Sequence, residues 1–285
     1  MTFATSGVTI SLPAAGFLLY VRAMNKLFAV MLVAACGDDP VAKVDAGGQP
    51  DTPPADAAVD ADTRAREGIV ILAEIRGADE DVTAAAILAD GPVFGTPIAS
   101  GGGCDVYADP EETGFSAGNI SITGTTEAIT LEPSTTTPVE YRPADPLPDD
   151  LFAPGATLTV AAAGATVPAF NATVTAPALL ENPVVPATIS RATPPSITWT
   201  AGTADEMWIW ILPLVGNGSN VIWCRAPDNG SFALTTAITA LIPAQATAGF
   251  VFLWRTNTTE ATAGNWTVDV TAGDVFGTDA VEFEQ

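Results

Sequence analysis

The segment Asn119-Ile120-Ser121-Ile122-Thr123 alternates isoleucines with short polar residues. Successive side chains of a β-strand point to opposite faces, so both isoleucines face one way. The same alternation returns at Val281-Glu282-Phe283-Glu284. Similar short β-branched or aromatic runs, separated by Gly, Pro, Asn or Asp, predict further strands. The predicted strands cover residues 69–75, 119–123, 156–161, 196–200, 207–212, 221–224, 250–255, 266–270 and 281–283.

The spacing of these strands predicts the fold class. The sequence shows no long amphipathic helix, and only residues 235–242 could form a short one, capped by Thr235 and ended by Pro243. Short strands at such spacing predict an all-β fold, with one or two antiparallel β-sandwich domains. Residues 196–199 and 207–210 resemble adjacent strands of an immunoglobulin-like or fibronectin-like module.

A change of composition suggests two domains. All six tryptophans lie between Trp199 and Trp266, and the Pro-rich segment 177–195 precedes them. We therefore expect a first β-sandwich domain at 68–183 and a second, Trp-rich immunoglobulin-like domain at 184–285. A single continuous sandwich is the alternative.

An apolar run, residues 27–35, follows Lys26 and ends at Cys36. It is too short to span a bilayer, which takes about 20 residues. Val33-Ala34-Ala35-Cys36 resembles the lipobox of bacterial lipoproteins. The resemblance implies that 1–35 is an export signal and that Cys36 is lipidated and anchors the protein to a membrane. A buried cysteine in an ordinary helix is the alternative.

Residues 1–23 hold a second apolar stretch broken by Pro13. We expect that the biological start is Met24 and that 1–23 is a gene-start artefact, the alternative being a long signal with two apolar pieces. Residues 36–67 combine the lipidated cysteine with a disordered acidic linker, since they lack aromatic residues and are rich in Asp, Ala and Pro. The resemblance further implies an outer-membrane location, because Gly37 rather than Asp follows the cysteine. Whether the protein faces the periplasm or the cell surface stays open.

The charge excludes one class of partner. Eight basic and 33 acidic residues follow Cys36, a net charge of −25. Such a charge repels phosphate backbones, so we expect no nucleic-acid partner.

Missing side chains exclude several catalytic chemistries. The chain has no histidine, and no lysine follows Lys43. Histidine-based triads and the usual zinc cages therefore cannot form, and Ser-Lys catalysis is excluded from the folded part. We predict no cofactor and no enzymatic activity, while a carboxylate-based glycoside hydrolase is kept as the third hypothesis. It requires a cleft with a carboxylic acid of raised pKa.

Two cysteines remain after Cys36. In an exported chain Cys104 and Cys224 are predicted to form a disulfide, the alternative being two separate buried thiols. For metals we predict no site. Asp228 and Asn229 are weak calcium candidates, although Asp228-Asn229-Gly230 is also an ordinary tight-turn sequence. Other acidic clusters beside turn residues are expected to be solvated loops: 79–81, 109–112, 149–150 and 205–206.

Two tryptophans offer a possible ligand platform. Trp208 and Trp210 point to one face of a predicted strand, where they form either a core or an exposed surface on which sugars stack. The leading hypothesis is a lipid-anchored envelope protein with a non-catalytic β-sandwich ectodomain, serving adhesion, scaffolding or binding of a glycan or protein ligand. The alternative is a carbohydrate-binding module using these two tryptophans.

Overall fold

The computed structural model describes residues 3–5, 8–10, 66–77, 81–108, 114–136, 139–215 and 220–284. The chain forms two compact units, Met1–Arg64 and Ala65–Gln285. In the first, β1 (Phe3–Thr5) and β2 (Val8–Ile10) pair as an antiparallel hairpin. Cys36, the rest of the predicted export signal and nearly all of the predicted linker lie outside the described residues. The last two linker residues, Arg66 and Glu67, instead begin strand β3 of the second unit.

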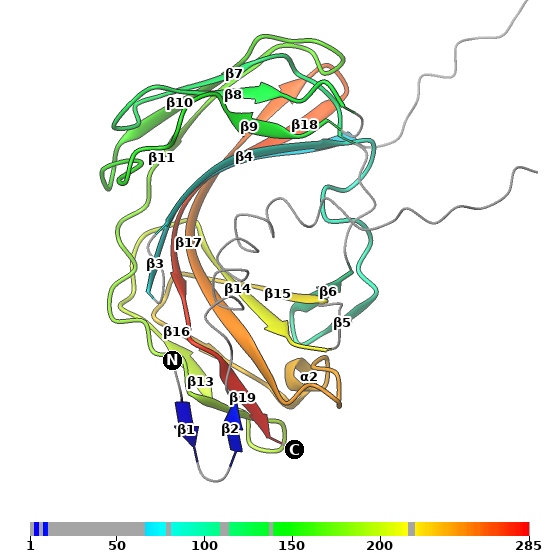
Figure 1. Ribbon diagram of the computed structural model, residues 1–285, viewed down its shortest axis with the longest axis vertical. Coiled ribbons are helices and arrows are strands. Elements are labelled where there is room, and N and C mark those ends of the chain that lie inside the picture. The colour runs from blue at the N-terminus through cyan, green and yellow to red at the C-terminus, as the bar shows by residue number, and fades with distance from the viewer. Residues whose placement is uncertain are drawn as a thin grey trace, which may run out of the picture. The chain divides into compact units, whose positions relative to one another are not determined.

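The second unit consists almost entirely of strands, most of them antiparallel, which confirms the predicted all-β class. Its largest sheet has ten strands (Figure 1). The order along its main path is β4 (Asp81–Ala89), β3 (Arg66–Gly77), β18 (Trp266–Gly277), β17 (Ala248–Ala263), β14 (Glu206–Pro213), β15 (Val221–Ala226), β6 (Cys104–Tyr107) and β5 (Ala99–Gly101). Strand β19 (Val281–Glu284) joins β17, and β12 (Thr188–Ser190) joins β19 in parallel.

Smaller elements complete the unit. A five-stranded sheet has the order β11 (Phe170–Thr175), β10 (Thr157–Ala162), β7 (Ile120–Thr123), β8 (Ile129–Pro133) and β9 (Tyr141–Pro143). Strand β13 (Ser196–Thr198) pairs with β16 (Ser231–Ala233). The predicted short helix is present as α2 (Thr236–Thr239), and its N-cap Thr235 accepts a hydrogen bond from the Ile238 amide. Within the described ranges, no helix has the length and apolar character needed to cross a bilayer.

The predicted domain boundary at 183/184 falls inside the large sheet. Strand β3 precedes that boundary and β18 follows it, yet the two pair in parallel over all 12 residues of each strand. The two predicted domains therefore share one sheet within one compact unit. Residues 196–199 and 207–210 also belong to different sheets, because β13 pairs with β16 whereas β14 pairs with β15 and β17. Local composition carries no information about such long-range pairing.

Two hydrophobic cores lie on the same face of the ten-stranded sheet. Alternate residues of β3, β4 and β18, such as Leu72, Leu88 and Val270, form the first core with the five-stranded sheet. Alternate residues of β14 and β15, such as Ile209 and Ile222, form the second core with β12, β13, β19 and α2. The intervening residues of all these strands point to the opposite face, which we call the pocket face.

The predicted disulfide between Cys104 and Cys224 is present. The two residues are direct partners in the pairing of β6 with β15, with Cα atoms 4.2 Å apart. The bond closes a loop with a sequence separation of 120 residues. In the chain-entropy model such a loop stabilises the fold by about 5 kcal/mol. It also holds β6, near one edge of the sheet, against β15.

Candidate functional site

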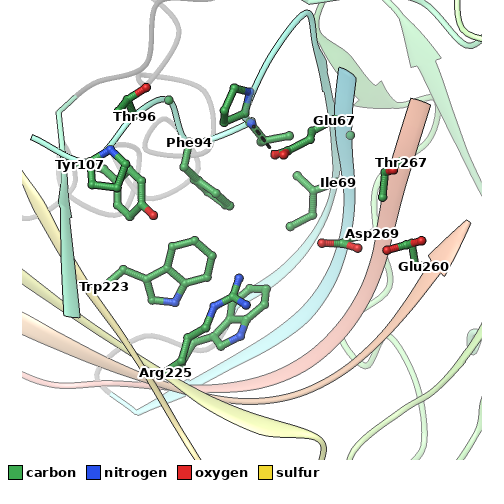
Figure 2. A pocket seen from close by; sticks show the side chains of 16 residues that line it. Glu67, Ile69, Phe94, Thr96, Tyr107, Trp223, Arg225, Glu260, Thr267 and Asp269 are labelled. Carbon is green, nitrogen blue, oxygen red and sulfur yellow. Dashed lines mark hydrogen bonds between the residues drawn. The ribbon is translucent and has the colours of Figure 1, made fainter. Parts of the chain in front are cut away.

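A pocket of about 600 Å³ opens on the pocket face. This volume is within the range of roughly 300 to 1,000 Å³ that is usual for small-molecule sites. Strands β3, β17 and β18 supply one side of it, and β6, β14 and β15 supply the other (Figure 2). Residues 92–97, between β4 and β5, complete the lining.

Four aromatic residues form what we call the aromatic wall: Phe94, Tyr107, Trp208 and Trp223. The rings contact one another, with centroids 4.7 Å apart for Phe94 and Trp223 and 5.1 Å apart for Trp208 and Trp223. Both contacts have the edge-to-face geometry that aromatic pairs favour. Burial and the nearby Asp105 carboxylate raise the pKa of Tyr107, so its phenol stays neutral. The wall is therefore a largely apolar surface with one hydroxyl.

Three carboxylates face the aromatic wall across the pocket, and we call Glu67, Glu260 and Asp269 the acidic wall (Figure 2). Sheet register places them together. Glu260 and Asp269 are direct cross-strand partners on β17 and β18, and Glu67 on β3 is the register partner of Thr267. Like charges that face each other directly across two strands are destabilising. Burial and the Glu260 and Glu67 carboxylates raise the pKa of Asp269, although Arg225 acts in the opposite direction.

Arg225 is the cation of the pocket lining. Its guanidinium carbon lies 4.6 Å from the Trp223 ring centroid and 6.0 Å from that of Trp208. It also forms a 3.9 Å ion pair with Glu206, which accepts a 2.7 Å hydrogen bond from the Trp208 indole. These contacts hold Arg225 along the aromatic wall.

The segment that completes the pocket is fixed at several points. The Val93 amide donates a 3.3 Å hydrogen bond to the Glu67 carboxylate, and Arg66 forms a 3.0 Å ion pair with Asp90. Gly95 has a φ of 72°, which is the left-handed conformation that glycine adopts without strain. Phe94 is thereby held against Trp223.

The predicted platform residues, Trp208 and Trp210, are both buried, with exposed fractions of 2% and 7%. Only Trp208 lines the pocket. Trp210 lies beside it on the pocket face, with its ring 4.7 Å from that of Trp254. These two side chains therefore do not form the exposed surface that was considered from the sequence. The other pocket residues escaped the sequence analysis, although alternation along β15 could have flagged Trp223 and Arg225.

The calcium candidate Asp228 serves a different purpose. It forms a 3.0 Å ion pair with Arg255, and the side chains are 2% and 3% exposed, respectively. Its carboxylate also accepts hydrogen bonds from the Trp199 indole at 2.8 Å and the Ala204 amide at 3.3 Å. Asn229 accepts a bond from the Ser231 amide in the turn. In the part of the chain that the structure describes, no group of three or more His, Cys, Asp or Glu could hold a metal ion.

The arrangement can bind a molecule that is apolar on one side and offers positive charge or hydrogen-bond donors on the other. Within the lining, three carboxylates outweigh one guanidinium, so anions are repelled.

Comparison of the chain with models of protein families, with curated proteins and with solved structures found no match. The chemistry of the pocket is therefore the basis for assigning a function.

Proposed function

We propose that this chain is a non-catalytic ligand-binding protein that holds a small amphipathic molecule between the aromatic wall and the acidic wall. One observation carries the proposal: a pocket of about 600 Å³ is lined by rings on one side and by carboxylates on the other. Concave sites of this volume in which aromatic side chains meet a few convergent polar groups are typical of small-molecule binding.

Binding is favoured over catalysis because the usual reactive groups are missing. The chain contains no histidine, and no lysine follows Lys43, so neither a His nor a Lys base is available in residues 66–284. The acids of the pocket sit side by side on one face of one sheet. A glycosidase instead needs two carboxyl groups that flank the scissile bond.

The proposal includes a place in the cell envelope. The lipobox-like Val33-Ala34-Ala35-Cys36 supports export and lipid attachment at Cys36, with the binding unit held outside the outer membrane or in the periplasm. The Cys104–Cys224 disulfide supports an oxidising compartment. Mass spectrometry of the protein from its native host tests this part, and an unacylated N-terminus upstream of Cys36 would contradict it.

The binding proposal is tested with two matched phenylalanine variants. Phe94 and Phe115 are both half-buried, and each packs edge-on against a tryptophan, at 4.7 Å and 5.4 Å respectively. Only Phe94 lines the pocket, because Phe115 packs against the first core. Tryptophan fluorescence of the full chain is titrated with phenethylamine, 2-phenylethanol and cellobiose. We expect Phe94→Ala to weaken binding of the responsive probe about tenfold, or about 1.4 kcal/mol, and Phe115→Ala to leave it unchanged. Equal affinities in the two variants, or no response to any probe, would refute the proposal.

A carboxylate-based glycoside hydrolase is the second candidate, and one observation favours it. Asp269 lies in the pocket with a raised pKa and has Glu260 as its cross-strand partner. A raised pKa lets a carboxyl group keep its proton to a higher pH, which is the property that a general acid requires. Release of a chromophore from nitrophenyl glycosides, lost in Asp269→Asn and in Glu260→Gln, would establish this activity. Absence of turnover across such a panel would exclude it for those sugars.

A further inference from the structure

We infer that the ligand of this pocket is an organic cation, with a positively charged nitrogen at the acidic wall and an apolar body against the aromatic wall. This inference rests on the proposed function and specifies its ligand class. The inference goes beyond the proposed function because a binding pocket could equally take an uncharged sugar.

Among the described residues, no ion pair joins an arginine to the acidic wall. The ion pairs of the described residues join Arg66 to Asp90, Arg76 to Asp274, Arg142 to Glu140, Arg225 to Glu206 and Arg255 to Asp228. None of these pairs includes Glu67, Glu260 or Asp269. Three carboxylates thus line one side of the cavity without an ion pair to a cation of the described residues, and Arg225 only partly offsets the charge of Asp269 from the other side.

The strand register makes the close placement of these three carboxylates unfavourable in the ligand-free protein. Glu260 and Asp269 are direct cross-strand partners, so their like charges repel each other across the two strands. Burial raises the pKa of Asp269 most, and the Glu260 carboxylate raises it further, as this repulsion requires, while Arg225 acts in the opposite direction. A cation bound beside them removes the repulsion, whereas a neutral molecule leaves it in place.

The opposite wall suits the rest of such a ligand. The rings of Phe94, Tyr107 and Trp223 lie within 4.7 to 6.1 Å of one another and present an apolar surface to the cavity. Arg225 already lies 4.6 Å from the Trp223 centroid, so this indole interacts with a protein cation. We therefore expect the charge of the ligand at the carboxylates and its body against the rings, which lie on opposite sides of the pocket (Figure 2).

Probes of matched shape test the charge requirement directly. Phenethylamine, 2-phenylethanol and 3-phenylpropionate carry similar rings with a positive, neutral or negative end, and cellobiose represents a sugar. Calorimetric titration of the full chain at neutral pH is expected to show phenethylamine binding at least about tenfold more tightly than 2-phenylethanol. Its affinity should fall when the salt concentration is raised, because an exposed charge is screened. Binding of 3-phenylpropionate and cellobiose should be weaker still.

Paired charge variants separate a local effect from net charge. Glu260→Gln/Asp269→Asn removes two charges from the acidic wall, while Glu282→Gln/Glu284→Gln removes two exposed ones from β19. The first variant should bind phenethylamine about tenfold less tightly and yet melt about 1–3 °C higher, since a repulsive pair is gone. The second variant should keep wild-type affinity. This opposite movement of affinity and melting temperature would not follow from a merely structural role.

Each outcome decides the inference. Equal binding of amine and alcohol, preference for cellobiose, no binding of the amine, or equal losses in the two charge variants would overturn it. The proposed function survives the first two of these results if Phe94→Ala still weakens binding. If Phe94→Ala leaves every affinity unchanged, the pocket itself is not the site and the proposed function falls as well.

Discussion

Asp228→Asn is expected to destabilise the fold by about 3 to 5 kcal/mol. The carboxylate and the Arg255 guanidinium are 3.0 Å apart, and their side chains are only 2% and 3% exposed, respectively. Removing one partner of a buried ion pair leaves a buried charge without compensation, and the cost is of that order. Arg255 keeps its bonds to the carbonyl oxygens of Leu179 and Thr200, which limits the loss. For a unit of this size the melting temperature should fall by about 6 to 20 °C.

Thermal denaturation followed by circular dichroism measures this loss. Arg142→Ala is the control, because its ion pair with Glu140 involves an arginine side chain that is 73% exposed, and such pairs contribute at most about 1 kcal/mol. Gly202→Ala provides an independent route to the same site, since an added Cβ would lie 2.3 Å from an Asp228 oxygen. Calcium should not shift the wild-type melting temperature, because Asp228 is already engaged. A loss below 1 kcal/mol for Asp228→Asn, or stabilisation by calcium, would show that the buried ion pair does not carry this stability.

Three further predictions concern stability and pH. Replacing Cys104 and Cys224 together with alanine should lower the free energy of unfolding by about 4 to 5 kcal/mol in urea titrations, and reduction of the wild type should have a similar effect. Glu74→Ala should cost about 1 to 3 kcal/mol in the same assay, because its carboxylate accepts 2.9 Å bonds from two successive backbone amides, whereas Glu74→Gln keeps an acceptor and should lose less. Affinity for phenethylamine should fall as the pH drops through the raised pKa of Asp269, since protonation removes the charge that attracts the amine. An affinity that does not change with pH, or the same pH dependence in Asp269→Asn, would contradict this prediction.

The sequence predicted the strands that have alternating β-branched or aromatic residues. Each predicted strand is present, including β7 (Ile120–Thr123) and β19 (Val281–Glu284). Strand β4 (Asp81–Ala89) was missed because its alanine run has little preference for a strand. Its conformation is imposed by pairing with β3 over residues 67–75. Pairing between distant segments also explains why the predicted domain boundary does not divide the sheet.

The candidate site was only partly accessible from the sequence. Trp208 was identified by alternation along one strand, and it lines the pocket. Glu67, Glu260 and Asp269 come from three strands and belong to none of the acidic clusters that stood out in the sequence. They meet only through the register of β3, β17 and β18, which cannot be derived from composition. By contrast, the disulfide could be predicted because few cysteines leave few possible pairs.

A crystal structure of the full chain soaked with phenethylamine would show where the pocket holds an amine. We expect density for the ring against Phe94 and Tyr107, and for the ammonium group within hydrogen-bond distance of the Asp269 or Glu260 carboxylate. An empty pocket in crystals that hold the amine elsewhere, or a ring and nitrogen placed the other way round, would contradict it.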